Sequence, residues 1–272
     1  MNAAPTLFDR PALRAHRQRA TPDAMFLHEL ARDEIQDRLA MVNKRFTKAA
    51  IITPFADIWA ADFPDAQIVV DDGILPLSEA RFDLVVHAMC LHWAEDPVGQ
   101  LIQCRRALME DGLCLIILLG GQTLNELRSV LAQAESTVTG GLSPRITPMA
   151  EIRDMGGLLQ RAGLTLPVAD SIDHTVTYRD MTHLMHDLRA MGETNALAGR
   201  LRHPTRRSVF DAASALYQKL FSAGNGRISA SFELICLTGW SPSDSQPKPK
   251  RPGSAQTRLA DALNVAEHPL PD

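Results

Sequence analysis

The chain has 272 residues, of which 45% are hydrophobic and 22% charged, and its 28 basic and 32 acidic side chains give a net charge of −4. This length can bury the core of one large domain, or of one domain with an added lobe. A weakly acidic chain is a poor general binder of nucleic acid or anionic membranes, because such binding rests on clustered lysines and arginines.

No apolar run approaches the ~20 residues of a membrane span. The first residues also lack the apolar stretch of a signal peptide. Four cysteines stand far apart with no C-x-x-C spacing, which favours free thiols in a reducing compartment over disulfides or a zinc site. We therefore expect a cytoplasmic protein with no nucleic-acid partner, no integral membrane segment and no metal site.

The first part of the chain alternates between helical and strand patterns. The stretch to about residue 46 has the period of an amphipathic helix. The helix before the last apolar run is expected to begin at Asp96-Pro97 and to end at Asp111-Gly112. Strands that alternate with helices predict a parallel sheet covered on both faces. The apolar runs expected to be buried strands cover residues 49–53, 67–70, 82–89 and 113–119.

The second half of the sequence predicts an α-rich lobe and a returning strand. We expect a helical segment over residues 1–46, one domain over residues 47–240 with its lobe at about 140–226, and a Pro/Ser-rich tail over residues 241–272 that is extended or disordered. The expected elements of this half are a loop at 140–148, helices at 151–162, 181–191 and 209–220, and strands at 172–178 and 228–240.

Long strings of the sequence carry a resemblance to a known family. FDLVVHAMCLHWAEDP (residues 82–97) and ALMEDGLCLIILLGGQTLNELR (107–128) are similar to class I S-adenosylmethionine-dependent methyltransferases. GGLSPRITPMAEIRDMGGLLQRAG (140–163), HLMHDLRAMGETNAL (183–197) and TGWSPSDSQPKPKRPGSA (238–255) resemble the bacterial relatives of a mitochondrial complex I assembly factor described as a protein arginine hydroxylase. The resemblance covers nearly the whole chain. It implies an α/β, Rossmann-like class I methyltransferase sheet, S-adenosylmethionine as cofactor, and a protein partner such as a complex I subunit.

The sequence departs from that family after the first strand. The family has a Gly-rich turn there, whose glycines let the backbone approach the cofactor. Here Thr53-Pro54 follows the strand, no glycine occurs between Ala49 and Asp72, and Pro54 lacks a backbone N–H. The interval from Ile52 to Phe82 has room for one helix and one strand, where the family places about two βα units. We expect a sheet shortened by about one βα unit, with an α-rich insertion and a returning antiparallel strand.

Candidate ligand residues follow the strands, because open α/β sheets bind ligands beyond the carboxyl ends of their strands. The resemblance matches Asp71 to an acid that faces the adenine amine, whereas the alternative is an acid that caps a turn. The pair His92-Trp93 could contact a ligand, or it could pack against the sheet edge at the start of a helix. His87, inside a strand run, would narrow or fill the cofactor cavity. The expected cofactor site comprises Thr53, Asp71, Asp72, His87, Leu91, His92 and Trp93.

Three other groups of polar side chains allow two interpretations each. His183 and His186 share a helix face and could hold a metal, although a solvated face is the simpler interpretation. The amino-terminal arginines, from Arg10 to Arg19, are expected on a solvated face with one or two ion pairs. Acids of the family-specific half could hold a substrate arginine or make salt bridges between lobes; they are Asp154, Asp187 and Glu193.

The sequence leads to one main function and two alternatives. The main hypothesis is a methyltransferase-superfamily protein of the complex I assembly type that acts on or binds a protein partner, with a degenerate or reshaped S-adenosylmethionine site. Whether it catalyses methyl transfer, arginine hydroxylation or nothing stays open. The first alternative is a non-catalytic assembly chaperone, which a cavity plugged by Phe55, Trp59 or His87 would favour. The second is a carrier-protein or small-acid O-methyltransferase of the biotin-pathway kind, which needs a patch of lysines and arginines near the pocket; we see none in the sequence.

Overall fold

The structure is a computed structural model that describes residues 6–247, 257 and 262–263. It divides into one unit over residues 1–242 and a second over residues 243–272. The described start of the second unit is a polar turn, in which the hydroxyls of Ser243 and Ser245 lie 2.9 Å apart. Most of the tail predicted over residues 241–272 lies outside the described residues.

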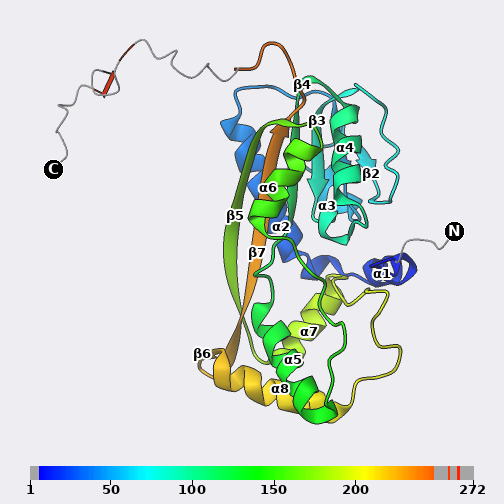
Figure 1. Cartoon of the computed structure of the whole chain (residues 1–272), viewed down its shortest axis with the longest axis vertical. Coiled ribbons are helices and arrows are strands. Elements are labelled where there is room, and N and C mark those ends of the chain that lie inside the picture. The colour runs from blue at the N-terminus through cyan, green and yellow to red at the C-terminus, as the bar shows by residue number, and fades with distance from the viewer. Residues whose placement is uncertain (1–5, 248–256, 258–261, 264–272) are drawn as a thin grey trace, which may run out of the picture. The chain divides into compact units, whose positions relative to one another are not determined.

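The first unit contains the helices and strands that the sequence alternation predicts (Figure 1). In chain order they are α1 (Arg10–Arg17), η1 (Pro22–Ala24), α2 (Phe26–Met41), β1 (Ala49–Ile52), α3 (Ala56–Ala60), β2 (Gln67–Val69), β3 (Phe82–Ala88), η2 (Leu91–Trp93), α4 (Pro97–Ala107), β4 (Leu108–Leu119), α5 (Asn125–Thr139), α6 (Ile152–Arg161), β5 (Thr165–Tyr178), α7 (Met181–Ala190), α8 (Arg207–Leu220), β6 (Ser222–Gly224) and β7 (Arg227–Trp240).

One mixed sheet organises this unit, in the strand order β2-β1-β3-β4-β7-β5, with β6 paired to β7. The strands from β2 to β4 are parallel, and β7 returns antiparallel between β4 and β5. One helix and one strand, α3 and β2, separate β1 from β3, so the predicted shortening by one βα unit is confirmed. The strand that remains, β2, pairs directly with β1 over Ala50–Gln67 to Ile52–Val69.

The order in which the chain adds strands to the sheet reverses between β1 and β3. From β1 the chain moves to β2 on one side and then returns to β3 on the other. Ligands of open α/β sheets bind beyond the carboxyl ends of the strands at such a point. The segments that leave β1, β2 and β3 therefore form the expected ligand edge.

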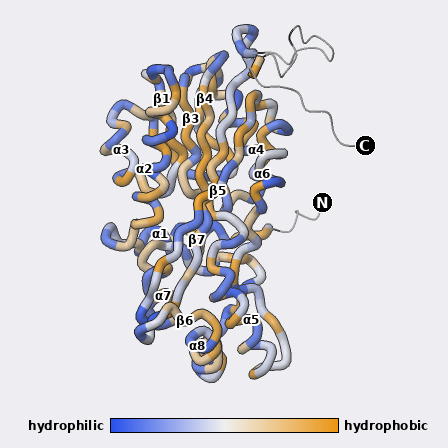
Figure 2. The backbone as a smooth tube through the Cα atoms, turned by 90° about the vertical axis from the view of Figure 1, so that its left-hand side faces the viewer, coloured by the Kyte–Doolittle hydropathy of each residue, from blue (hydrophilic) through white to orange (hydrophobic). Residues whose placement is uncertain are grey.

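The core lies on both faces of the central strands. All seven residues of β3 except Asp83 are buried, as are the last eight residues of β4, which explains their unbroken apolar runs. One face packs against α2, α5, α7 and α8, and the other against α4 and α6. Figure 2 shows the same division as hydrophobic colour along the central strands and more polar colour on the surrounding segments.

Two predicted helix boundaries were wrong. The stretch before residue 46 is not one helix: Thr21 is extended ahead of Pro22, which lacks an N–H, and this break separates α1 from α2. The helix opened by Asp96 ends at Ala107, and Asp111 lies within β4, where it takes φ 55°. Lys44 holds that turn through a 2.7 Å contact between its Nζ and an Asp111 carboxylate oxygen.

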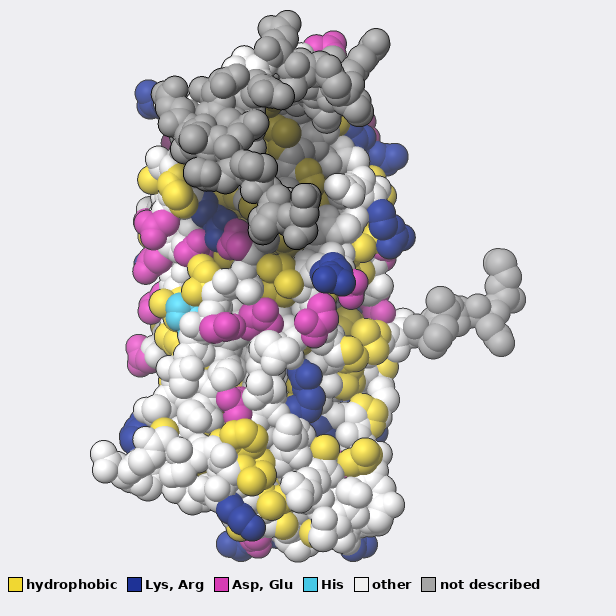
Figure 3. Space-filling model, turned by 60° about the vertical axis from the view of Figure 1, so that its left-hand side comes forward, with side chains coloured by type: hydrophobic (Ala, Val, Ile, Leu, Met, Phe, Trp, Pro, Cys, Tyr) yellow, Lys and Arg dark blue, Asp and Glu magenta, His cyan; other side chains and the backbone are white. Residues whose placement is uncertain are grey.

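The outer edge of the sheet is longer and more polar than the sequence predicts. β5 spans 14 residues and alternates between half-buried and exposed side chains over most of its length. Figure 3, which brings the β5 side of the molecule forward, shows acidic side chains gathered in a band across the middle of this face. Among the described residues, no helix has both the length and the apolar character needed to cross a bilayer.

Candidate functional site

The predicted ligand residues reach the carboxyl edge of the sheet but face different surroundings. Thr53 follows β1 and is committed to the backbone: its N–H donates to the Val69 carbonyl at 2.9 Å, and its hydroxyl accepts from Phe55 N–H. Asp72 follows β2 with an exposed carboxylate, which caps the N–H of Gly73. Thr53 and Asp72 therefore support the loops rather than an open ligand site.

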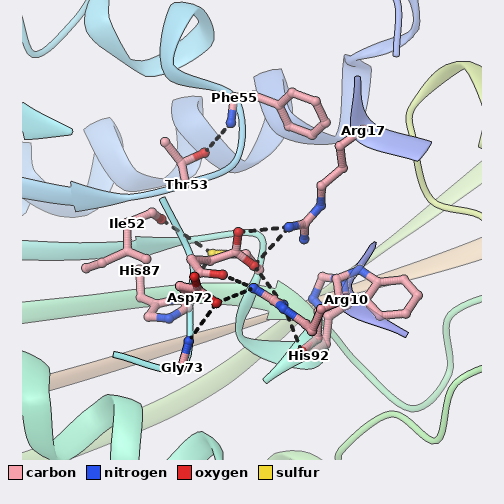
Figure 4. Close-up of polar contacts among 12 residues, drawn as sticks. Arg10, Arg17, Ile52, Thr53, Phe55, Asp72, Gly73, His87 and His92 are labelled. Carbon is pink, nitrogen blue, oxygen red and sulfur yellow. Dashed lines mark hydrogen bonds and ion pairs between the residues drawn. The ribbon is translucent and has the colours of Figure 1, made fainter. Parts of the chain in front are cut away.

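Asp71 is the centre of a buried ion-pair cluster. Its carboxylate is 2% exposed and accepts from one Arg17 guanidinium nitrogen at 2.8 and 2.9 Å. Arg10 approaches the same carboxylate at 3.5 Å and also donates to the backbone carbonyls of Asp71 and Trp93. Figure 4 shows Arg10 and Arg17 converging from the α1 side onto the loop that contains Asp72 and Gly73. The acid that the resemblance assigns to a cofactor is thus already paired with two cations.

The space beside this cluster is small. A cavity of about 190 Å³ is lined by Arg10, Arg14, Arg17, Pro54 and the loop of residues 70–72. Pockets for drug-sized or cofactor ligands occupy roughly 300–1,000 Å³. Pro54 offers no N–H, and Asp71 has no open oxygen face. In this arrangement the residues do not fit S-adenosylmethionine.

His87 and Leu91 belong to the core rather than to a cavity. The His87 imidazole is fully buried, with Nε2 2.7 Å from the side-chain oxygen of Gln100 and Nδ1 3.5 Å from the sulfur of Cys90. Burial lowers the pKa of His87 to about 4, so the ring is neutral at physiological pH. Leu91 is 1% exposed in the apolar cluster on the α4 side. His87 is therefore a buried residue of the core whose ring is held by Gln100.

His92 and Trp93 meet a residue from the distant half of the chain, Glu193. The indole N–H of Trp93 donates to Glu193 Oε2 at 2.9 Å, and Nε2 of His92 lies 3.6 Å from the same oxygen. Burial alone would raise the pKa of Glu193, but the His92 ring and the charge of Arg17 lower it to about 2. Glu193 is therefore a buried carboxylate that stays ionised. Its second oxygen has no hydrogen-bond donor among the described side chains.

Glu193 lines a mainly apolar cavity beside the sheet, a space of about 400 Å³. The cavity lies beyond the end of β4 and is walled by residues of α5, α7, α8 and η2. Its apolar walls include Trp93, Leu127, Met185 and Phe232. Such a space can hold an aliphatic chain with one cationic group against Glu193.

One rim of this cavity is fixed by a salt bridge. Arg145 donates to both oxygens of Glu135, at 3.0 and 2.6 Å, and Ser143 donates to the same carboxylate. The hydrogen bond from Arg145 lowers the pKa of Glu135 to about 2 despite its partial burial. The predicted loop at residues 140–148 is therefore held in one arrangement at the cavity.

Some polar residues play different roles from those expected. Arg17 is 9% exposed, so the prediction of a solvated face was wrong for this residue, whereas ion pairs, which were also expected of these arginines, form at Arg10 and Arg17. A signal was present, because Arg10, Leu13 and Arg17 recur on one face of α1 and Leu13 is fully buried. His28 was missed altogether: its ring is 2% exposed, and burial lowers its pKa to about 4.

The other expected acids and histidines lie apart from the cavity's carboxylate. Asp187 accepts from the Tyr178 hydroxyl at 2.9 Å, and Asp154 is on α6 at the opposite face of the sheet. His183 is exposed, and His186 is exposed at the cavity wall. Within the described residues, no group of three or more potential ligands is placed to hold a metal ion.

The chain is similar to known proteins over most of its length. Residues 33–116 match the family described as "Methyltransferase domain". The mitochondrial arginine-hydroxylase NDUFAF5 of Danio rerio is 35% identical over 207 residues, which cover 76% of this chain and 64% of that protein. The chain is thus similar to a methyltransferase domain over residues 33–116 and to NDUFAF5 over most of its length.

The chain is also similar to two proteins that are described as methyltransferases. A malonyl-[acyl-carrier protein] O-methyltransferase of Xylella fastidiosa is 38% identical over 179 residues, covering 66% of this chain and 58% of that protein. A solved putative methyltransferase of Bacillus halodurans is 15% identical with a TM-score of 0.49, and the match covers 77% of this chain and 98% of that one. The chain spans less than two thirds of the length of either curated relative.

Proposed function

We propose that this chain is a partner-binding protein of the complex I assembly type, which takes an arginine side chain of its partner into the cavity at Glu193. The name of the NDUFAF5 relatives, arginine-hydroxylase, supports arginine as the recognised side chain. We further propose that it works in the cytoplasm and that its S-adenosylmethionine site is degenerate, which favours the non-catalytic chaperone over a methyltransferase.

The observation that carries this proposal is the buried, ionised carboxylate of Glu193 in an otherwise apolar cavity. A buried charge is unfavourable unless it is paired and hydrogen-bonded. Trp93 satisfies one oxygen of Glu193, and the other is left for a ligand. A guanidinium can donate two parallel hydrogen bonds to a carboxylate, and its aliphatic stem suits the apolar walls. The face of Trp93 adds an attractive surface for a cation.

The closed cofactor position supports the second part of the proposal. Methyl transfer requires the methyl donor and its acceptor to be held in line. Arg10 and Arg17 pair with Asp71 at the place where a donor's adenine would need that acid. The proposal thus assigns the closing of this position to Arg10 and Arg17 of α1, the two residues that pair with Asp71.

The proposal is tested by titrating the full chain with N-acetylarginine amide and following the indole ¹⁵N–¹H signal of Trp93 by NMR. We expect a saturable shift of this signal, because the indole N–H donates to Glu193, the carboxylate proposed to bind the guanidinium. The neutral citrulline analogue should bind at least tenfold more weakly, about 1.4 kcal/mol. Glu193→Gln should weaken arginine binding similarly.

The matched control is Glu110→Gln, which neutralises an exposed carboxylate of β4. It should leave the arginine affinity unchanged. Equal binding of arginine and citrulline analogues, or no response of the Trp93 signal, would contradict the proposal.

A further inference from the structure

A strongly basic loop stands out in this weakly acidic chain. Residues 200–207 have the sequence RLRHPTRR, with four arginines and no acid. Arg200 and Arg202 share the single carboxylate of Asp9 at 2.9 Å each. Arg206 and Arg207 are exposed and make no ion pair among the described residues; Asp211, one turn further along α8, does not pair with Arg207. The loop therefore keeps an uncompensated positive charge.

This loop borders an open groove of about 560 Å³, which we call the basic groove. Apolar side chains of Leu142 and Leu201 line it and remain 69% and 39% exposed. Val138 and Val209 form its floor, and Arg206 lies at its side. The groove thus combines exposed leucines with Arg206, which makes no ion pair among the described residues, and Arg207 follows it directly in the chain.

The basic groove adjoins the Glu193 cavity. Arg145 lines both spaces, and Glu135 holds it in place. On α8, Val209 lines the groove, while its neighbour Phe210 lines the cavity. A chain that inserts one side chain into the cavity must continue across this border. The charges that it meets are opposite in sign: a carboxylate in the cavity and guanidinium groups along the groove.

We infer that the basic groove docks an acidic, leucine-containing segment of the same protein partner whose arginine enters the cavity. This inference rests on the proposed function and adds the chemistry of the partner around its arginine. Carboxylates of the segment pair with Arg206 and Arg207, and its apolar side chains cover Leu142 and Leu201. Complementary charge at such a rim sets partner choice and association rate.

The test uses a display library of random 16-residue peptides, selected on the purified full chain and in parallel on three variants. Arg206→Glu/Arg207→Glu reverses the charge of the groove. Arg153→Glu/Arg161→Glu, on two exposed arginines of α6, is its matched control. Glu193→Gln reports on the cavity.

We expect peptides selected on the wild-type chain to be enriched in Asp, Glu and Leu around an arginine. The groove reversal should abolish the acidic enrichment and weaken an individual selected peptide at least tenfold. The α6 control should change neither. Binding of the selected acidic peptides should weaken as salt rises.

The two proposals fail separately in this experiment. Arginine enrichment without acidic enrichment, or acidic enrichment that survives the groove reversal, overturns the docking inference and leaves the cavity proposal standing. Acidic enrichment without arginine, unaffected by Glu193→Gln, overturns the cavity proposal alone. No enrichment on the wild-type chain overturns both, and tight binding of an oligonucleotide that competes for Arg206 and Arg207 would assign the groove to nucleic acid instead.

Discussion

Asp71 makes structural contacts at a position where the resemblance implies a ligand group. Its carboxylate is enclosed by Arg17 and Arg10, while the adjacent Asp72 is exposed to solvent. Removing one partner of a buried ion pair leaves the other charge uncompensated, which costs about 3–5 kcal/mol. An exposed ion pair contributes at most about 1 kcal/mol.

Asp71→Ala should therefore lower the free energy of unfolding by about 3 kcal/mol in urea denaturation. The neighbouring variant Asp72→Ala should lower it by less than about 1 kcal/mol. Because Arg17→Met removes the uncompensated cation, Asp71→Ala/Arg17→Met should recover part of the lost stability. Similar effects of the two single aspartate variants would show that Asp71 is not buried among the arginines.

Two buried imidazoles make stability depend on pH. Burial lowers the pKa of both His28 and His87 from 6.5 to about 4. The unfolded chain therefore binds more protons than the folded chain between about pH 6.5 and 4. The free energy of unfolding should fall as the pH is lowered through this window, by about 3 kcal/mol for each imidazole.

Urea titrations between pH 7.5 and 4 should show this decline. His28→Leu should reduce its slope by the contribution of one imidazole, whereas the exposed His183→Asn should not. The lowered pKa values of Glu135 and Glu193 add a decline in stability below about pH 5, but all three proteins share these glutamates, so the comparison of slopes holds. An equal slope in all three proteins would mean that His28 titrates normally in the folded state.

At the scale of elements, the position of α1 depends on its approach to the end of α7. Gly192 takes φ +82°, and a Cβ there would lie 3.1 Å from the Arg17 Cα. Phe8 adds an edge contact with the Trp93 ring, at 5.2 Å between centroids. This approach brings Arg17 to Asp71, so the ion-pair cluster depends on a glycine far along the chain.

Gly192→Ala should lower the free energy of unfolding by about 1–2 kcal/mol, because a non-glycine residue is strained in the left-handed region. Gly199→Ala is the control, since its nearest neighbour would lie at 3.9 Å and its φ is not positive. Urea denaturation of both variants measures the difference. If Gly192→Ala were as stable as Gly199→Ala, α1 would not be held closely against this turn.

Sequence patterns predicted which helices and strands form more accurately than they predicted where those helices and strands end. The runs that became β1, β3 and β4 were recognisable because buried strands are continuously apolar. The end of α4 was not, because Asp111 and Gly112 look like a helix stop but form an irregular part of β4. Pro22 marks the break between α1 and α2 in the sequence, but the helical periodicity on both sides of it favoured one continuous helix.

At the scale of the molecule, the sequence predicted which loops lie at the ligand edge of the sheet. It did not predict which side chains from distant segments contact those loops. The missing glycines after β1 indicated a changed cofactor site from sequence alone. The pairing of Arg17 with Asp71 joins residues 54 positions apart, and that of Trp93 with Glu193 joins residues 100 apart. No local pattern encodes such contacts, because they arise only when α1 and the turn after α7 pack beside the sheet edge.

The basic loop illustrates the same limit. Its arginines are plain in the sequence, but nothing there places them beside the cavity. Arg145, which borders both spaces, lies more than fifty residues earlier in the chain. The structure therefore shows a cationic surface beside the Glu193 cavity that the sequence analysis did not predict.

We propose that Arg10 and Arg17, paired with Asp71, occupy the cofactor position at the sheet edge. The most direct test is calorimetric titration of the full chain with S-adenosylmethionine and S-adenosylhomocysteine, after unfolding and refolding to remove any bound ligand. Circular dichroism would first establish that the refolded protein matches the native one. We predict no binding heat and no thermal shift at millimolar ligand. Binding tighter than ~100 μM, about −5.5 kcal/mol, would contradict the account.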